Sequence, residues 1–273
     1  MLMTTSKIHR AADKLTLSID IGGSHLKAGV VDANGTLVAG PVRVATPSPA
    51  TSNRVLDTLM TMTRPLGPFD RVSVGFPGVV RNGTVLTAPN LVTKHWRNFP
   101  LGRTLSGQLG KPVRLLNDAS IQGLGVIVGK GLECVLTLGT GMGFALYRQG
   151  HLMPHMEMGQ HIARGDATYD QYVGDATLRD IGRKPWNKRM RKVVDAMEML
   201  LNYDTLYLGG GNAKQIAFDL PANVRIVSNQ AGVTGGARLW DPIMDELFPT
   251  PEAAQAEETT STAKSVPAQA PHA

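Results

Sequence analysis

One stretch near the start of the chain, residues 15–31, constrains the fold more than any other; it reads LTLSIDIGGSHLKAGVV. Apolar and polar residues alternate, the alternation breaks at Gly22, Gly23 and Ser24, and it then resumes. This pattern predicts two strands joined by a glycine turn. Since glycine lacks a Cβ, the backbone N–H groups of such a turn can approach an anion closely. Taken alone, the stretch fits an ordinary hairpin equally well.

Two charged residues flank this turn. Asp20 ends the first strand and Lys27 lies on the returning strand. A carboxylate does not bind phosphate directly, but it can hold Mg²⁺ through water. We therefore expect Asp20 to orient a magnesium ion beside a phosphate site that Lys27 helps to form.

Composition narrows the class of protein. The chain has 273 residues, of which 42% are hydrophobic and 18% charged, as expected for a core shared by one or two domains. The net charge of +6 allows an anionic partner without naming one. The single cysteine, Cys134, excludes an internal disulfide, and its apolar surroundings predict a buried thiol. No apolar run approaches the ~18 residues of a membrane span, so we expect no membrane contact and a cytoplasmic location.

The remaining pattern alternates strands with helices. Residues 1–14 read as a flexible lead-in, 41–50 as a loop, 151–172 as an irregular polar segment, and 249–273 as a disordered tail rich in Ala, Glu, Thr, Pro and Gln. A hairpin is expected at 79–86. Beyond residue 31, strands are expected at 36–38, 71–76, 113–116, 134–138, 144–148, 205–208 and 224–227. Helices are expected at 52–64, 101–109, 120–128, 186–201 and from 232 to 240.

Four strand ends carry glycine or acidic turns in a fixed order: DIGGS at 20–24, LNDA at 116–119, LGTGMG at 138–143 and LGGG at 208–211. Together they resemble the sugar kinases of the actin-like ATPase superfamily, and within it the ROK family of repressors and kinases. The segments GFPGVVRNGTV at 75–85, APNL at 88–91 and EMG at 157–159 strengthen this resemblance. The chain looks closest to the polyphosphate glucokinase branch, with NQAGVTGGA at 229–237 where that branch has a similar helix start. The likeness covers residues 15–245.

The resemblance implies an α/β fold of two actin-like (ribonuclease H-like) domains, 15–117 and 118–248, with a cleft between them and the last helix packing back on the first domain. It implies a phosphoryl transfer from polyphosphate, ATP or both to the 6-hydroxyl of a hexose, with glucose expected, and it implies Mg²⁺ and a homodimer. Regulators of this family carry a DNA-binding domain before the first glycine turn. Only residues 1–14 precede that turn's first strand here, so we expect no nucleic-acid partner.

The resemblance also assigns residues. Asp118 is the expected general base, because a sugar kinase must deprotonate the attacking hydroxyl. The turn of Gly22, Gly23 and Ser24 would face the transferred phosphoryl group from one side. Gly139, Thr140 and Gly141 would face it from the other, and Gly209, Gly210 and Gly211 would form the nucleotide-side turn, or simply connect a strand to a helix. Asn90, Asn117, Asp118 and Glu157 would bind the sugar, while Asn117-Asp118 also fits a helix N-cap.

The chain departs from the family at one motif. The family has E-x-G-H, whereas this chain has Glu157, then Met-Gly, then Gln160 and His161. Either Gln160 replaces the sugar-binding histidine or His161 acts after a shift of one residue. A second sugar-binding acid is not evident, and Asp166 is the nearest candidate. A retargeted kinase, or a non-catalytic sugar-binding protein, is therefore the alternative function.

The sequence does not distinguish ATP from polyphosphate as the phosphoryl donor. Six cations fall within residues 183–192: Arg183, Lys184, Lys188, Arg189, Arg191 and Lys192. Such a basic strip suits an extended polyphosphate chain, much as it suits a nucleic-acid backbone, but a solvated helix face has the same composition.

Overall fold

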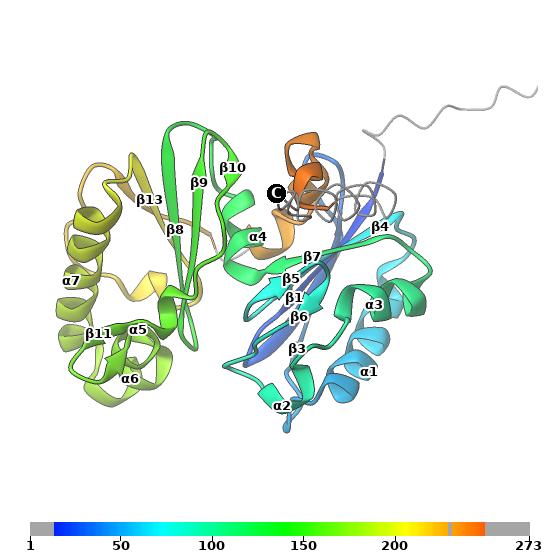
Figure 1. Cartoon of the computed structure of the whole chain (residues 1–273), viewed down its shortest axis with the longest axis horizontal. Helices are drawn as coiled ribbons and strands as arrows, with labels where there is room; N and C mark the ends of the chain where they lie inside the picture. The colour runs from blue at the N-terminus through cyan, green and yellow to red at the C-terminus, as the bar shows by residue number, and fades with distance from the viewer. Residues whose placement is uncertain (1–13, 229–230, 249–273) are drawn as a thin grey trace, which may run out of the picture.

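The computed structural model describes residues 14–228 and 231–248, so the predicted lead-in and tail lie almost wholly outside the described residues. Two five-stranded sheets, with strand orders β3-β2-β1-β4-β7 and β10-β9-β8-β13-β14, stand side by side (Figure 1). The expected α/β fold with one such sheet in each half of the chain is confirmed.

The first sheet contains β1 (Thr16–Ile21), β2 (His25–Val31), β3 (Leu37–Ala45), β4 (Arg71–Phe76) and β7 (Val113–Asn117). β1, β2 and β3 are antiparallel because short turns connect them, whereas β4 and β7 run parallel to β1. Helices α1 (Ser52–Thr63) and α3 (Leu101–Leu109) supply the crossovers. Their apolar stripes pack on this sheet, with residues such as Val55, Leu59 and Leu105 fully buried.

The second sheet contains β8 (Leu132–Leu138), β9 (Met142–Arg148), β10 (His151–Leu152), β13 (Thr205–Gly209) and β14 (Val224–Ile226). The long helix α7 (Arg183–Leu201) covers its outer face (Figure 1). Trp186, Met190, Val193 and Met197 form the buried stripe of that helix, which packs against Leu136 and Leu206 of the sheet. Cys134 lies in the same core and is fully buried, as expected.

Two short segments join the halves. Helix α4 (Asp118–Leu124) contacts strands of both sheets. The final elements are α8 (Ala231–Thr234), the 3₁₀ turn η5 (Ala237–Trp240) and the 3₁₀ segment η6 (Pro242–Leu247). η6 contacts β10 of the second sheet, while α8 contacts β1 and β2 of the first sheet. There the Ser73 hydroxyl donates to the Gly236 carbonyl at 2.6 Å and accepts from the Trp240 indole N–H at 2.9 Å.

Smaller elements fill the connections. The expected hairpin at 79–86 is present as β5 (Val80–Arg81) and β6 (Thr84–Val85). The polar segment at 151–172 contains only short pieces: β10, η3 (Met158–Gln160), β11 (Ile162–Arg164), β12 (Ala167–Thr168) and α5 (Tyr169–Val173). The others are η2 (Arg64–Leu66), α2 (Thr93–Trp96), α6 (Asp175–Ile181) and η4 (Ala213–Gln215).

Several predicted bounds are wrong. The residues expected as a loop at 41–50 continue β3 to Ala45, since an edge strand accommodates the proline at position 41. The helix expected at 120–128 begins at Asp118 and ends at Leu124, and the one expected at 186 begins at Arg183. The final helix, expected at 232–240, divides into α8 and η5. Across the described ranges, we find no helix whose length and hydropathy would let it cross a membrane.

Candidate functional site

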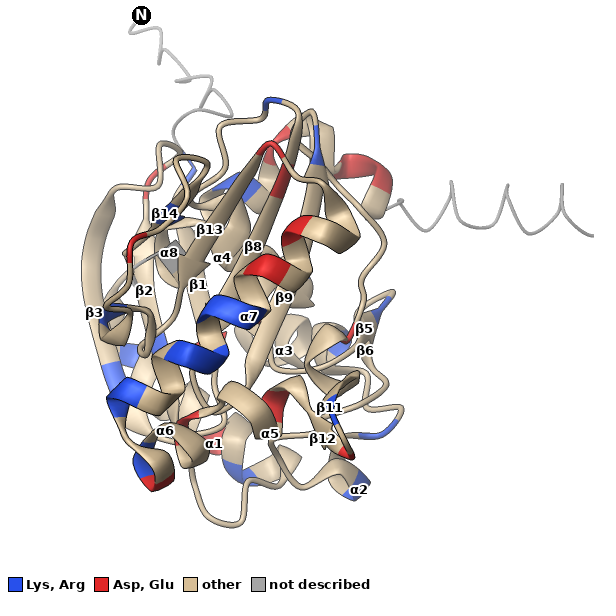
Figure 2. Ribbon diagram, turned by 90° about the vertical axis from the view of Figure 1, so that its left-hand side faces the viewer, with Lys and Arg blue, Asp and Glu red and all other residues tan. Residues whose placement is uncertain are grey.

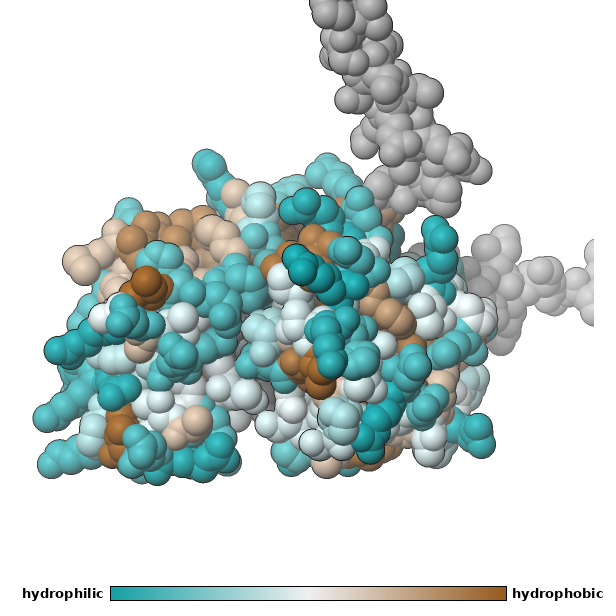
Figure 3. All heavy atoms as spheres, turned by 60° about the horizontal axis from the view of Figure 1, so that its bottom comes forward, coloured by the Kyte–Doolittle hydropathy of each residue, from teal (hydrophilic) through white to brown (hydrophobic). Residues whose placement is uncertain are grey.

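A cleft of about 350 Å³ lies between the two sheets, at the ends of their first strands, and the surface is hollowed there (Figure 3). Most of the residues that the sequence nominates line it: Asp20, Gly22, Gly23, Ser24, Lys27, Asn90, Asn117, Asp118, Gly139, Thr140, Gly141, Glu157, Gly210 and Gly211. Gly209, Gln160 and His161 do not line it. The cleft therefore collects residues from segments far apart in the chain.

The two glycine turns predicted to face a phosphoryl group touch each other. The Ser24 and Thr140 hydroxyl oxygens lie 3.2 Å apart, within hydrogen-bond distance. The first turn closes through the Gly22 N–H, which donates to the His25 carbonyl at 3.0 Å. Thr46, just beyond β3, holds the same turn, because its hydroxyl donates to the Gly22 carbonyl at 2.6 Å.

The second turn rests on the glycine turn that follows β13. Gly210 has a φ of +83°, and a Cβ there would lie 2.3 Å from the Leu138 carbonyl oxygen, so only glycine fits without a shift. The Asn212 N–H donates to the same carbonyl at 2.9 Å, and the Asp175 N–H donates to the Gly139 carbonyl at 2.9 Å. Gly209 itself does not line the cleft, and a Cβ there would lie 2.8 Å from Gln122 Nε2.

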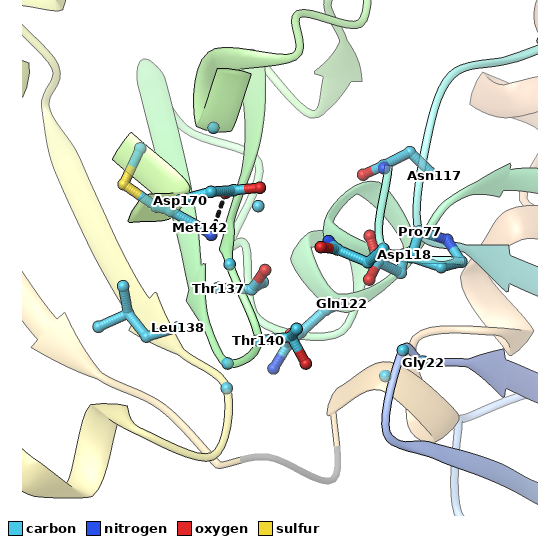
Figure 4. Close-up of a pocket in the computed structure, with 18 of the residues that line it drawn as sticks. Gly22, Pro77, Asn117, Asp118, Gln122, Thr137, Leu138, Thr140, Met142 and Asp170 are labelled. Atoms are coloured by element: carbon cyan, nitrogen blue, oxygen red, sulfur yellow. Dashed lines mark hydrogen bonds between the residues drawn. The ribbon is translucent and has the colours of Figure 1, made fainter. Parts of the chain in front are cut away.

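Asp118 lies in the cleft at the start of α4 (Figure 4). Its Oδ1 accepts from the Ala119 N–H at 2.8 Å. Removal from water raises the pKa of this carboxyl to about 8, and the neighbouring carboxylates of Asp20 and Glu157 add to the rise. A carboxyl that titrates near neutral pH is suited to accept and release a proton.

Asn117 acts as the N-cap of α4, as one of its two interpretations predicted. Its Oδ1 accepts from the Ala119 N–H at 2.9 Å and the Ser120 N–H at 3.4 Å. Its amide nitrogen donates to the Phe76 and Gly78 carbonyls at 3.4 and 3.3 Å. The side chain thereby fixes the point where β7 turns into α4, which places Asp118 in the cleft.

Three residues expected near Glu157 at the sugar site do not line the cleft. Gln160 and His161 are exposed and point no group into the cleft, and Asp166 is exposed as well and does not line it. His155 does line it, and its Nε2 lies 2.5 Å from Glu157 Oε1. The histidine that contacts Glu157 is therefore His155, two residues earlier in the chain, and no sequence motif predicted it.

Asp170 is the acid that sequence reasoning missed. It lines the cleft opposite Asp118 (Figure 4), where its Oδ1 accepts from the Met142 N–H at 2.7 Å. Its Oδ2 accepts from Gln160 Nε2 at 2.8 Å. A signal for it exists in the sequence, because Thr168 and Gln171 have the spacing of a capping box and form one here. That places Asp170 in the first turn of a helix, where a carboxylate is favoured.

Comparison with known proteins identifies the family of this chain. The model of the ROK family matches residues 16–164. A polyphosphate glucokinase of Mycobacterium tuberculosis (strain CDC 1551 / Oshkosh) is 32% identical over 235 residues, which cover 80% of this chain and 88% of that protein.

Solved structures show the same relationship. Inorganic polyphosphate/ATP-glucomannokinase from Arthrobacter sp. strain KM superposes with a TM-score of 0.74 at 31% identity, covering 83% of this chain and 98% of that one. A ROK family glucokinase from Streptomyces griseus, in complex with glucose and AMPPNP, shares the fold with a TM-score of 0.68 at 21% identity, over 82% of this chain and 98% of the other. This chain belongs to the ROK family.

Proposed function

We propose that this hexokinase-type phosphotransferase transfers a phosphoryl group from polyphosphate, ATP or both to the 6-hydroxyl of a hexose, with glucose as the expected sugar. The names of the similar proteins, polyphosphate glucokinase and polyphosphate/ATP-glucomannokinase, support the reaction and both donors. The observation that carries the proposal is that Asp118 shares one cleft with two glycine turns in mutual contact. A base and a phosphate cradle side by side are what phosphoryl transfer to an alcohol needs.

In the proposed reaction, the hydroxyl oxygen of the sugar attacks the terminal phosphorus of the donor. Its proton passes to the Asp118 carboxylate, an oxygen–phosphorus bond forms, and the bond from that phosphorus to the bridging oxygen breaks. The leaving group is ADP or a polyphosphate one unit shorter. The backbone N–H groups of Gly23, Ser24, Thr140 and Gly141 would bind the charge on the phosphoryl oxygens.

The residues present fit a magnesium ion held through water. Asp20 lines the cleft, and Lys27 Nζ pairs with its Oδ2 at 2.8 Å. In the ranges 14–228 and 231–248 we find no group of three or more His, Cys, Asp or Glu that could hold a metal. Mg²⁺ commonly binds through one or two carboxylates, waters and substrate phosphates, and when bound it neutralises phosphate charge.

We further propose that Asn90 and Glu157 bind sugar hydroxyls, since both line the cleft and the Glu157 carboxylate is close enough to Asp118 to raise its pKa. Gly210 and Gly211 would face the nucleotide when ATP is the donor. We place the domain boundary at 117/118, where the Asn117 cap joins β7 to α4. The homodimer and the cytoplasmic location stay predictions, testable by sedimentation and by cell fractionation.

The first experiment measures sugar 6-phosphate formation from glucose and Mg²⁺, with ATP and with long-chain polyphosphate in parallel. Product with either donor supports the kinase. Product with neither, in a folded preparation that binds glucose calorimetrically, favours the second candidate, a non-catalytic or retargeted sugar-binding protein. The observation that favours this candidate is Gln160, which contacts Asp170 instead of lining the cleft. A panel of other hexoses then separates a retargeted kinase from a non-catalytic protein.

A further inference from the structure

Charge is unevenly distributed within the cleft. Of the described residues that line it, only two carry a fixed positive charge: Lys27 on β2, which pairs with Asp20, and Arg43 on β3. Carboxylates are more numerous: Asp20, Asp118, Glu157, Asp170 and Asp175. A phosphoryl donor is a polyanion, so the wall formed by β2 and β3 is where its remaining negative charge is most favourably placed.

The geometry of this wall follows from strand register. Lys27 and Arg43 are direct cross-strand partners in the β2–β3 ladder, so their side chains leave the same face. His25 precedes Lys27 by two residues and shares that face, and it lines the cleft as well. The Arg43 guanidinium lies 3.0 Å from His25 Nδ1. We call these three residues, His25, Lys27 and Arg43, the β2–β3 ledge.

The ledge adjoins the first phosphate turn directly. His25 is the residue whose carbonyl closes that turn by accepting from the Gly22 N–H. Burial, with the charges of Arg43 and Lys27, lowers the pKa of the His25 imidazole. A neutral imidazole accepts the Arg43 hydrogen bond and aims the guanidinium, while an incoming anion would favour its protonation.

We propose that the β2–β3 ledge binds the non-transferred phosphates of an inorganic polyphosphate chain. This inference rests on the proposed kinase function. It states where the polyphosphate chain, one of the two proposed donors, would lie in the cleft. The proposed nucleotide turn, Gly210 and Gly211, belongs to the opposite sheet, so the nucleoside of ATP would draw its phosphates away from the ledge. Polyphosphate has no nucleoside and would follow the positive charge on β2 and β3.

The basic strip of α7 suits this role less well. Figure 2 shows the cations along the first half of that helix, and none of them lines the cleft. Three of the six are engaged by neighbouring residues: Arg183 donates to the Gln215 carbonyl, Arg189 stacks on Tyr172, and Arg191 stacks on Phe218. The exposed lysines, such as Lys188, therefore provide a matched control for general surface charge.

The test compares Arg43→Gln, Arg43→Lys and Lys188→Gln with the parent chain. We measure kcat/KM for long-chain polyphosphate and for ATP in the same preparations. Arg43→Gln is expected to lower the polyphosphate-to-ATP ratio of kcat/KM by about tenfold, as for loss of one charge-assisted contact. Arg43→Lys should restore part of the ratio, and Lys188→Gln should leave it unchanged.

A second measurement tests the charge itself. The slope of log kcat/KM for polyphosphate against log salt should become shallower by about one in Arg43→Gln, as when one phosphate contact is removed from a polyanion complex. A misfolded variant would lose activity with polyphosphate and with ATP in the same proportion. It would not change the salt dependence for polyphosphate alone.

Three results would contradict the proposal that the β2–β3 ledge binds polyphosphate. One is an unchanged donor ratio in Arg43→Gln, and another is a fall in the ratio in Lys188→Gln of the same size. The third is a parent chain in which polyphosphate neither reacts nor inhibits the ATP reaction; ATP-driven turnover would then still uphold the kinase. If polyphosphate only inhibits, its inhibition constant replaces kcat/KM in the same comparison. Absence of product with either donor would instead count against the proposed function.

Discussion

The imidazole of His155 and the carboxylate of Glu157 form a close pair, with Nε2 and Oε1 2.5 Å apart in the wall of the cleft. The other ring nitrogen, Nδ1, is buried and has no hydrogen-bond partner among the described residues. A neutral ring with its proton on Nε2 donates to Glu157 and leaves only an acceptor unpaired, which costs less than an unpaired N–H. His155 thereby fixes the orientation of the carboxylate proposed to bind the sugar.

We predict that His155→Leu raises the KM for the sugar about tenfold, as expected for loss of a hydrogen bond to a charged group, while kcat changes by less than about threefold. His155→Gln keeps an N–H near the position of Nε2 and should restore most of the affinity. Steady-state kinetics with sugar varied at saturating donor checks both. Equal KM values in the two variants would show that His155 only fills space.

Asp118 gives a prediction for the pH dependence of activity. Its pKa of about 8 means that the carboxylate form gains population as the pH rises from 6 to 9. We expect kcat/KM for the sugar to rise over this range with a midpoint near pH 8. Asp118→Asn keeps the oxygen that accepts from the Ala119 N–H, yet it should lower kcat by about a thousandfold or more, since it cannot take a proton. Near-normal turnover would remove Asp118 from the role of base.

The same residue links pH to stability. The folded pKa of Asp118 lies above the ordinary value, so between about pH 4 and 8 the unfolded chain binds fewer protons at this site than the folded chain. This carboxyl therefore makes the free energy of unfolding fall as the pH rises through that window. Asp118→Asn removes the effect, and we predict that it stabilises the fold by at least about 2 kcal/mol more at pH 8 than at pH 4.5. Urea unfolding at both pH values measures the difference. A variant that is equally destabilised at both would contradict the raised pKa.

Sequence reasoning worked where the chain carries its own local signal. The glycine turns after β1, β8 and β13 follow alternating or apolar strands, so their positions could be read directly. They reach one cleft because strands of this fold end at a common edge. Asp118 likewise follows the apolar strand β7, whereas its role as base came from the family resemblance and stays a prediction.

The residues that were missed depend on tertiary contacts. Arg43 lies in a segment whose proline, serine and threonine content is typical of a loop, but pairing with β2 makes it an edge strand and directs the side chain to the cleft. His155 and Asp170 belong to an irregular polar segment without periodicity. Only packing against the turn at 139–142 brings Asp170 into the site, through its bond to the Met142 N–H.

Trp240 anchors the end of the described chain to the first sheet. Its indole N–H donates to the Ser73 hydroxyl at 2.9 Å, and the Arg114 guanidinium lies 4.4 Å from the ring centroid. We predict that Trp240→Ala lowers the free energy of unfolding by about 2–4 kcal/mol, because the half-buried ring loses both its packing and this cation–π contact.

Trp240→Phe separates these contributions. It keeps a ring for Arg114 but leaves the Ser73 hydroxyl without its donor, so we expect a loss of only about 1 kcal/mol. Met199→Ala, at a residue on α7 that is 82% exposed, is the matched control and should change stability by less than about 0.5 kcal/mol. Urea titration followed by circular dichroism measures all three. A Trp240→Ala variant as stable as the control would show that the C-terminal segment packs on the first sheet without holding it.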